Sequence, residues 1–117
     1  MDLNAAIKAH SDWKIKLRSA ITSRATLDVG QIEKDNCCEL GKWLHGESKL
    51  TLGKLPAHGE CIRLHASFHR EAARVATAIN HRAYTDAEQM LTPDSTYTKA
   101  SQAVVIAIGS LQRQMRK

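Results

Sequence analysis

The sequence predicts an all-α fold, a four-helix bundle with an additional short helix that carries cysteine. Glycine and proline are sparse, with 6 and 2 in 117 residues, and aromatic side chains make up only 4% of the chain. This composition favours helices joined by short turns over strands. Apolar residues recur three and four positions apart along the longest segments, which is the period of an amphipathic helix. The length and a hydrophobic content of 43% predict one domain, residues 1–117, with its own core.

The first predicted helix begins at Leu3 and continues for about 20 residues. Asp2 can cap its start, because a short acidic side chain accepts hydrogen bonds from the first free N–H groups. His10 falls among apolar neighbours on the core-facing side, so one imidazole is expected to face the interior. The apolar stripe consists of Leu3, Ala6, Ile7, Trp13, Leu17, Ala20 and Ile21.

Two connections surround a short helix in the next part of the chain. Residues 22–36 are mostly polar and contain a glycine, which predicts a connection. Residues 37–44 read Cys-Cys-Glu-Leu-Gly-Lys-Trp-Leu and predict a short helix that ends at Gly46. The second connection also contains Gly53 and Pro56.

The longest periodic segment, residues 57–82, predicts a helix of about 20 or more residues. His65 and His69 are four positions apart, one helical turn, and therefore share a side of this helix. Its apolar stripe consists of Cys61, Leu64, His65, Phe68, Ala72, Val75, Ala76 and Ile79.

Two further helices are predicted towards the C-terminus. Thr85-Asp86-Ala87-Glu88 resembles a capping box, which predicts a short helical turn ending near Leu91. Residues 103–108 of the last helix are apolar on nearly every side, so this segment is expected either at the centre of the bundle or against a second subunit. The stripe of the last helix consists of Tyr97, Ala100, Val104, Ile108, Leu111 and Met115.

The chain carries a formal net charge of +5, but its cations are scattered. The one local cluster, Arg113, Arg116 and Lys117, suits the last turn of a helix, where cations oppose the helix dipole. Without a groove-reading motif or stacking aromatics, nucleic-acid binding is not expected, and a basic scaffold for anionic partners is a minor alternative. No apolar run reaches about 18 residues and the N-terminus lacks a signal-peptide pattern, so a cytoplasmic chain without a membrane span is expected.

The cysteines and histidines indicate a metal site. Three cysteines are an odd number in a chain without a secretory signal, so metal ligation or a reactive thiol is more plausible than a disulfide framework. Zn²⁺ takes about four nitrogen or sulfur ligands in a tetrahedron. His65 and His69 on one helix, His10 on another and Cys38 at the start of the short helix offer such a set to one interior. The alternatives are core histidines with ordinary hydrogen bonds and an inert buried thiol.

Several enzyme classes are excluded by what surrounds these residues. Ala66 stands where a zinc protease of the His-Glu-x-x-His type needs its general base. The sequence contains no Glu-x-x-His pair for a di-iron carboxylate site and no glycine-rich phosphate loop. A nucleophilic pair of Cys38 with a histidine would lack an evident orienting acid. A binding module is therefore expected, not an enzyme.

Three motifs in order resemble the chemoreceptor zinc-binding (CZB) domain family: His10-Ser11-Asp12-Trp13-Lys14, Cys38-Glu39-Leu40-Gly41-Lys42-Trp43-Leu44 and His65-Ala66-Ser67-Phe68-His69. The resemblance implies that His10, Cys38, His65 and His69 bind Zn²⁺ in a helical bundle that forms a symmetric homodimer. It also implies a regulatory module of a chemoreceptor or a diguanylate cyclase, and the sequences around the two tryptophans look more like the chemoreceptor branch. The 117 residues contain no output domain, so either a stand-alone member or a piece of a longer receptor is expected.

A zinc-bound Cys38 would be a thiolate, the form that oxidants attack, so this residue is predicted to be redox-reactive. The resemblance implies oxidants such as hypochlorous acid, or free zinc itself, as the cue. The alternative is a purely structural zinc domain that only holds the helices together.

Neighbouring residues are assigned supporting roles. Trp13 and Trp43 are expected to pack about the site, or to be ordinary core aromatics, and Gly41 to permit a close approach between elements. Candidate acceptors for the ligands' ring N–H groups are Asp12, Asp35 and Glu39. Cys37 is expected not to bind the metal, with trapping of an oxidised Cys38 as the alternative role, and Cys61, one turn before His65, is expected to be a buried core thiol, with an alternate metal ligand as the alternative. His45, His58 and His81 are expected to be surface or turn histidines.

Overall fold

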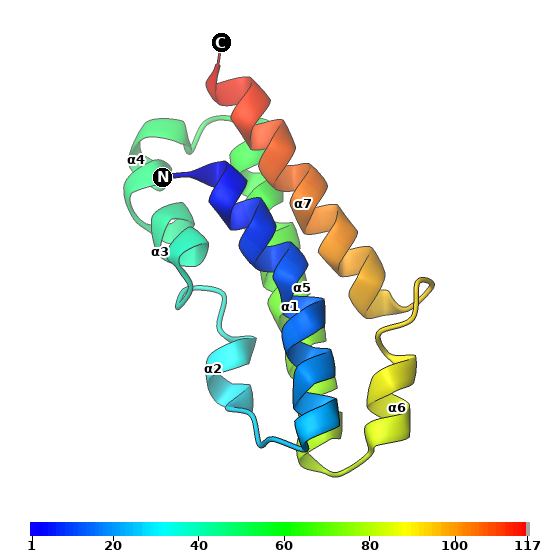
Figure 1. Ribbon diagram of the computed structural model, residues 1–117. Coiled ribbons are helices and arrows are strands. Elements are labelled where there is room, and N and C mark those ends of the chain that lie inside the picture. The colour runs from blue at the N-terminus through cyan, green and yellow to red at the C-terminus, as the bar shows by residue number, and fades with distance from the viewer. Residues whose placement is uncertain (117) are drawn as a thin grey trace.

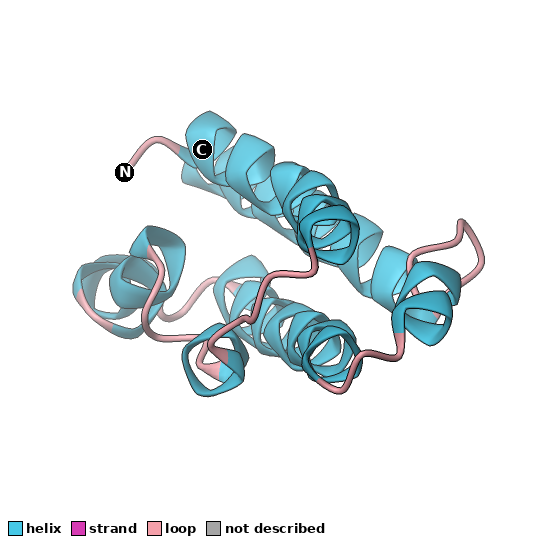
Figure 2. Cartoon of the chain, turned by 60° about the horizontal axis from the view of Figure 1, so that its bottom comes forward, coloured by secondary structure: helices cyan, strands magenta, loops and turns pink. Residues whose placement is uncertain are grey.

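The computed structural model describes residues 1–116, which form seven helices (Figure 1) and no strand (Figure 2). The prediction of an all-α bundle is therefore confirmed. Three helices have 20 residues or more, and four are short. Their bounds are Leu3–Ser23 for α1, Val29–Glu33 for α2, Glu39–His45 for α3, Glu47–Leu52 for α4, Pro56–Asn80 for α5, Tyr84–Gln89 for α6 and Thr96–Met115 for α7.

The long helices α1, α5 and α7 form the frame of the bundle. Helix α7 packs along both α5 and α1, and the short helices α2 and α3 lie against α5 where a fourth long helix would stand. Helices α1 and α7 are antiparallel, because Asn4 at the start of α1 accepts a hydrogen bond from Gln112 while Lys14 donates to Thr98. Helix α3, which has Cys38 at its N-cap, packs against α1 and α5, the long helices that carry His10, His65 and His69.

Helix ends follow the capping residues. Asp2 caps α1 by accepting from the Ala5 N–H at 3.1 Å, as predicted, and Ser95 caps α7 by accepting from the Thr98 N–H at 3.1 Å. Lys117, predicted to oppose the dipole of the last helix, lies outside the described residues.

Both predicted connections contain a short helix, so those predictions were wrong in part. In residues 22–36, Asp28 caps α2 and the apolar Ile32 side chain packs into the core, which together stabilise a single turn. In the second connection, α4 is held by Ser48, whose side chain is buried. The predicted capping box at Thr85 is also absent, because the turn after α5 brings the chain into helix at Tyr84 and leaves Ala83 at the N-cap.

The predicted stripes form the core, with Leu17, Phe68, Val75, Val104 and Ile108 fully or almost fully buried. The apolar segment 103–108 of α7 has one face in this core, but Ile106 on the opposite face is 67% exposed. Met115, at the end of the last stripe, is 42% exposed. Helix α7 therefore has an apolar surface that residues 1–116 leave uncovered.

The connection between α1 and α2 is fastened to the far end of α5. The Asn80 side chain accepts a hydrogen bond from the Leu27 N–H at 2.8 Å and donates one to the Leu27 carbonyl at 2.7 Å. This paired contact fixes the start of the segment that leads to Cys38.

Candidate metal centre

Four side chains from three helices meet beside α5. They are His10 of α1, Cys38 at the N-cap of α3, and His65 and His69 of α5. One ligand atom from each lies within 4.8 Å of the other three. These are the four residues that the sequence analysis selected, and the structure brings all of them together.

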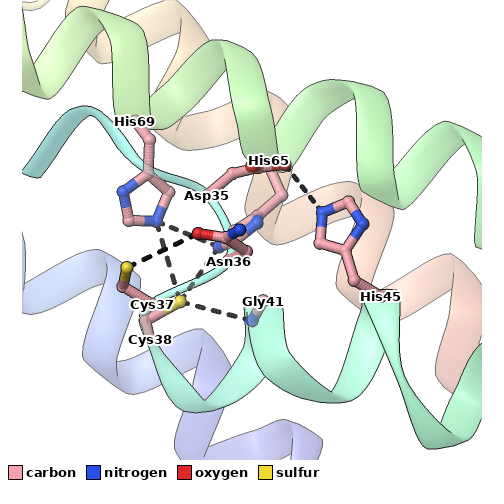
Figure 3. A network of polar contacts seen from close by, with 8 residues as sticks. All are labelled: Asp35, Asn36, Cys37, Cys38, Gly41, His45, His65 and His69. Carbon is pink, nitrogen blue, oxygen red and sulfur yellow. Dashed lines mark hydrogen bonds and ion pairs between the residues drawn. The ribbon is translucent and has the colours of Figure 1, made fainter. Parts of the chain in front are cut away.

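The two histidines of α5 provide adjacent nitrogens. Their Nε2 atoms are 3.0 Å apart, as expected for positions one turn apart on the same side of a helix (Figure 3). Both rings are buried, with 0% exposure for His65 and 3% for His69. The pair is thus shielded from bulk water.

Cys38 reaches these nitrogens from the opposite side (Figure 3). Its Sγ atom lies 3.3 Å from His65 Nε2 and 3.7 Å from His69 Nε2. It also accepts a hydrogen bond from the Gly41 N–H at 3.3 Å, which caps α3. The hydrogen bond that starts α3 therefore also orients the sulfur toward the histidines.

Two histidines have their tautomers set by backbone carbonyls. His10 Nδ1 lies 2.7 Å from the Ala6 oxygen, and His69 Nδ1 lies 2.8 Å from the Ile32 oxygen. Because a carbonyl only accepts, each Nδ1 carries the proton and each Nε2 keeps a lone pair. His10 Nε2 is buried and has no hydrogen-bond partner within residues 1–116. An ion at the centre of the cluster would satisfy it.

All four residues of the cluster fit Zn²⁺ in chemistry, and three of them also fit it in spacing. Zn–N bonds of about 2.0–2.1 Å and Zn–S bonds of about 2.3 Å put tetrahedral ligand atoms roughly 3.3–3.6 Å apart. The separations among His65 Nε2, His69 Nε2 and Cys38 Sγ are 3.0, 3.3 and 3.7 Å and lie close to that range, while the set of four that includes His10 spans up to 4.8 Å. Three imidazoles with one thiol form a borderline-soft donor set of the kind that suits zinc.

Burial keeps the imidazoles in the neutral form that binds metals. It lowers the pKa of His65 to about 3, helped by the neighbouring His69 and His10. Burial also lowers the pKa of His10 and His69, against the hydrogen bonds to Ala6 and Ile32 that raise them. All three rings are therefore neutral at neutral pH and available as ligands.

The Cys38 thiol has opposing influences. Burial raises its pKa, whereas the backbone N–H groups of Gly41 and Leu40 lower it, and the net direction is upward. A divalent cation reverses this balance, because a coordinating thiol loses its proton.

Gly41 is needed where α3 crosses the preceding loop. A β-carbon at this position would lie 1.8 Å from the Asp35 carbonyl oxygen and 2.8 Å from its carbon. The close approach is thus between a helix and a loop.

Trp13 and Trp43 are both partly buried against the core, and the Lys16 ammonium lies over the Trp13 ring at 5.1 Å.

The ring N–H acceptors are different from the candidates proposed from the sequence. Asp12 pairs with Lys8 at 2.6 Å, Asp35 pairs with His45 at 2.9 Å, and Glu39 is exposed in the first turn of α3. The carbonyls of Ala6 and Ile32 hold the His10 and His69 rings instead. Every residue has a carbonyl, so no residue type marks these acceptors in a sequence.

Among the remaining cysteines and histidines, one prediction was wrong. Cys37 Sγ contacts the Asn36 side chain, and Cys61 is fully buried, which raises the pKa of its thiol to about 11. His58, expected at the surface, is only 2% exposed, and its Nε2 lies 2.9 Å from Ser48 Oγ. A signal was present, because His58 precedes Cys61 by three positions and shares its stripe.

Comparison with protein families gives a match to the chemoreceptor zinc-binding domain (CZB) over residues 10–76, more than half of the chain. The chain belongs to the CZB family. All four clustered side chains of this CZB domain lie inside the matched segment. Comparisons with curated proteins and with solved structures gave no match. In residues 1–116 of the CZB domain, no helix has both the length and the apolar character that a membrane span requires.

Proposed function

We propose that this CZB domain is a zinc-binding regulatory module of bacterial signal transduction, in which His10, Cys38, His65 and His69 hold one Zn²⁺. The observation that carries the proposal is the convergence of three imidazoles and a thiol from three helices within 4.8 Å. The preset tautomers of His10 and His69 support it, because each leaves an Nε2 lone pair for an ion. The module acts by binding and not by catalysis, in the cytoplasm, as part of chemotaxis signalling.

Cys38 is the group that responds to the cue. Zinc, when bound, keeps this sulfur as a thiolate at neutral pH. The thiolate attacks the chlorine of hypochlorous acid, so that an S–Cl bond forms while the Cl–O bond breaks and hydroxide leaves. Water then displaces chloride at the sulfur and loses a proton, which leaves Cys38 as a sulfenic acid. Because the oxidised sulfur is a weaker donor, α3 loses its tie to the histidines of α5.

The same site supports sensing of zinc itself, through the fraction of molecules in which it is occupied. In either case the signal is a shift of α3 relative to α1 and α5, passed to the output module of a chemoreceptor. A diguanylate cyclase is the second candidate for that output module. A purely structural zinc domain would use the same four ligands but would resist oxidants while folded.

The module is proposed to act as a homodimer. An open groove of about 480 Å³ runs along α1 and α7 and is lined in part by Lys14, Val105 and Ile106. Ile15 on α1 and Ile106 on α7 are 68% and 67% exposed. Two such apolar side chains beside a groove favour contact with a second copy.

Zinc content per chain tests the proposed ligand set. Wild-type protein purified without added metal is expected to contain one zinc per chain by elemental analysis, and Cys38→Ala much less. Cys37→Ala is the matched control, because it removes the neighbouring thiol that lies outside the cluster. Equal zinc in the wild type and Cys38→Ala would contradict the proposal.

Oxidant titration separates the sensor from the structural domain. Substoichiometric hypochlorous acid is expected to form sulfenic acid at Cys38 and to release zinc to a chromogenic chelator, with no response in Cys38→Ser. Retention of zinc with the fold intact would favour the structural domain.

A further inference from the structure

A cavity of about 220 Å³ lies between the first three turns of α1 and the start of α3. Its wall includes two members of the metal cluster, His10 and Cys38, together with the exposed residues Asp2, Ala5 and Glu39. The cavity therefore leads from the outer surface of α1 and α3 to the side of the cluster that His10 and Cys38 form. The other two clustered residues, His65 and His69, lie on α5 and outside its lining.

We propose that this cavity is the route by which zinc enters and leaves the cluster. The proposal rests on the proposed zinc binding and adds a path to it. His10 is 3% exposed, and its Nε2 lacks a hydrogen-bond partner within the described chain while the residue lines this cavity. Cys38 is only partly buried and lines the same cavity. These two residues are the first ligands that an entering ion would meet.

The charge at the cavity suits a divalent cation. The chain as a whole carries +5 and repels cations, but Asp2 and Glu39 place two carboxylates on the cavity wall. Met1 also lines the cavity and brings its α-ammonium group, but no lysine or arginine does among the described residues, so the two carboxylates leave the lining with a net negative charge. Opposite charge at a narrow approach raises the local concentration of an ion and its association rate.

Small side chains keep the cavity open. Ala5 and Ala9 are one turn apart on the exposed side of α1, and both line the cavity. A leucine at either position would fill part of the cavity and would leave all four clustered residues unsubstituted. Ala5 and Ala9 therefore determine the rate at which zinc enters and leaves the cluster, and they do not contribute to the affinity for zinc.

The first experiment measures zinc loading of the metal-free protein by stopped flow and zinc release to an excess of a strong chelator. Ala5→Leu and Ala9→Leu are expected to slow both rates by a common factor of about tenfold, as a rearrangement past an overpacked side chain would. The dissociation constant stays the same, because the barrier changes and neither end state does. Ser19→Leu, on an exposed position of α1 outside the cavity, is the matched control and keeps wild-type rates.

The second experiment removes the charge. The double variant Asp2→Asn with Glu39→Gln keeps an N-cap at the start of α1 but loses both carboxylates. It is expected to load zinc several-fold more slowly at low ionic strength and at the wild-type rate in high salt, where screening removes the attraction. Glu47→Gln, in the first turn of α4, is the matched control.

Wild-type rates in both leucine variants and in the charge variant would overturn the proposed route, as would an equal slowing by Ser19→Leu. A changed dissociation constant with an unchanged loading rate would also overturn it. A wild-type protein that binds no zinc would overturn the zinc proposal itself, so the two failures are distinguishable.

Discussion

At Gly41, a single hydrogen atom occupies the place where any other residue would put a β-carbon 1.8 Å from the Asp35 carbonyl oxygen. The same residue donates its N–H to Cys38 Sγ. Gly41→Ala must therefore push the loop away from α3 and move the sulfur. We expect a loss of stability of about 2 kcal/mol or more, as for other overpacked buried positions, and weaker zinc binding.

Gly59→Ala is the matched control for this prediction. Gly59 lies within α5, and an added β-carbon there meets nothing within 4 Å. Alanine is the better helix former, so stability should rise by up to about 1 kcal/mol. Chemical denaturation measures both variants, and a Gly41→Ala protein as stable as Gly59→Ala would contradict the role given to Gly41.

The buried histidines predict how the metal-free protein responds to acid. Burial lowers the pKa of His65 from an ordinary 6.5 to about 3 and also lowers those of His10 and His69. Between pH 6.5 and pH 3 the histidines of the unfolded chain bind protons that those of the folded chain do not. The free energy of unfolding is therefore highest above pH 6.5, where the histidines are neutral in both states, and it falls as the pH drops towards 3.

Denaturant titrations of the metal-free protein between pH 7 and pH 4 check this dependence. His65→Gln removes the group with the largest contribution, so its loss of stability over the same interval should be smaller. Equal slopes for the wild type and His65→Gln would show that His65 is not the source of the dependence.

The four clustered residues could be selected from the sequence because histidine and cysteine are distinctive and two of the positions fall on apolar helical stripes. The carbonyls of Ala6 and Ile32 could not, since a backbone acceptor is independent of residue type. The sequence predicts a close approach at Gly41 but not its partner, because the position of the Asp35 carbonyl depends on the path of the loop.

At the scale of whole elements, α4 is tied to α5 by one buried hydrogen-bonded pair. Ser48 Oγ donates to the Trp43 carbonyl at 2.8 Å and accepts from His58 Nε2 at 2.9 Å. Ser48→Ala leaves His58 without a partner in an environment that water does not reach. We expect a loss of roughly 1–3 kcal/mol of stability, the cost of an unsatisfied buried polar group.

Thermal or denaturant unfolding measures the effect of Ser48→Ala. Ser19→Ala is the control, because Ser19 is exposed on α1 and its change should alter stability by at most about 0.5 kcal/mol. If both variants matched the wild type, the Ser48–His58 pair would not join α4 to α5.

The long helices could be predicted because each repeats its apolar period over several turns. Helices α2 and α4 could not, because a helix of five or six residues has too few periods to show one. These two helices are stabilised by tertiary contacts, which are those of Ile32 with the core and of Ser48 with His58.

At the scale of the whole molecule, the exposed apolar side chains of α1 and α7 predict self-association. Ile106→Glu places a charge on the uncovered face of α7 without disturbing the buried Val104 and Ile108. It should convert a dimer into a monomer in analytical ultracentrifugation while the helical content stays unchanged. Leu50→Glu is the control, since Leu50 is 90% exposed on α4, away from that face. A dimer that survives Ile106→Glu would place the interface elsewhere.

The fastening of Leu27 by Asn80 has a consequence for reversibility. Ile32 is packed into the core further along the same segment, and Cys38 follows it by only six residues. A Cys38 sulfur that has dissociated from the histidines can therefore move no more than about 20 Å from Ile32, which is the full length of six extended residues. Because this tether is short, the effective concentration of the Cys38 sulfur at the histidines stays in the millimolar range. Cys38 would be recaptured by its own chain once reduced, and the bundle could reset without unfolding.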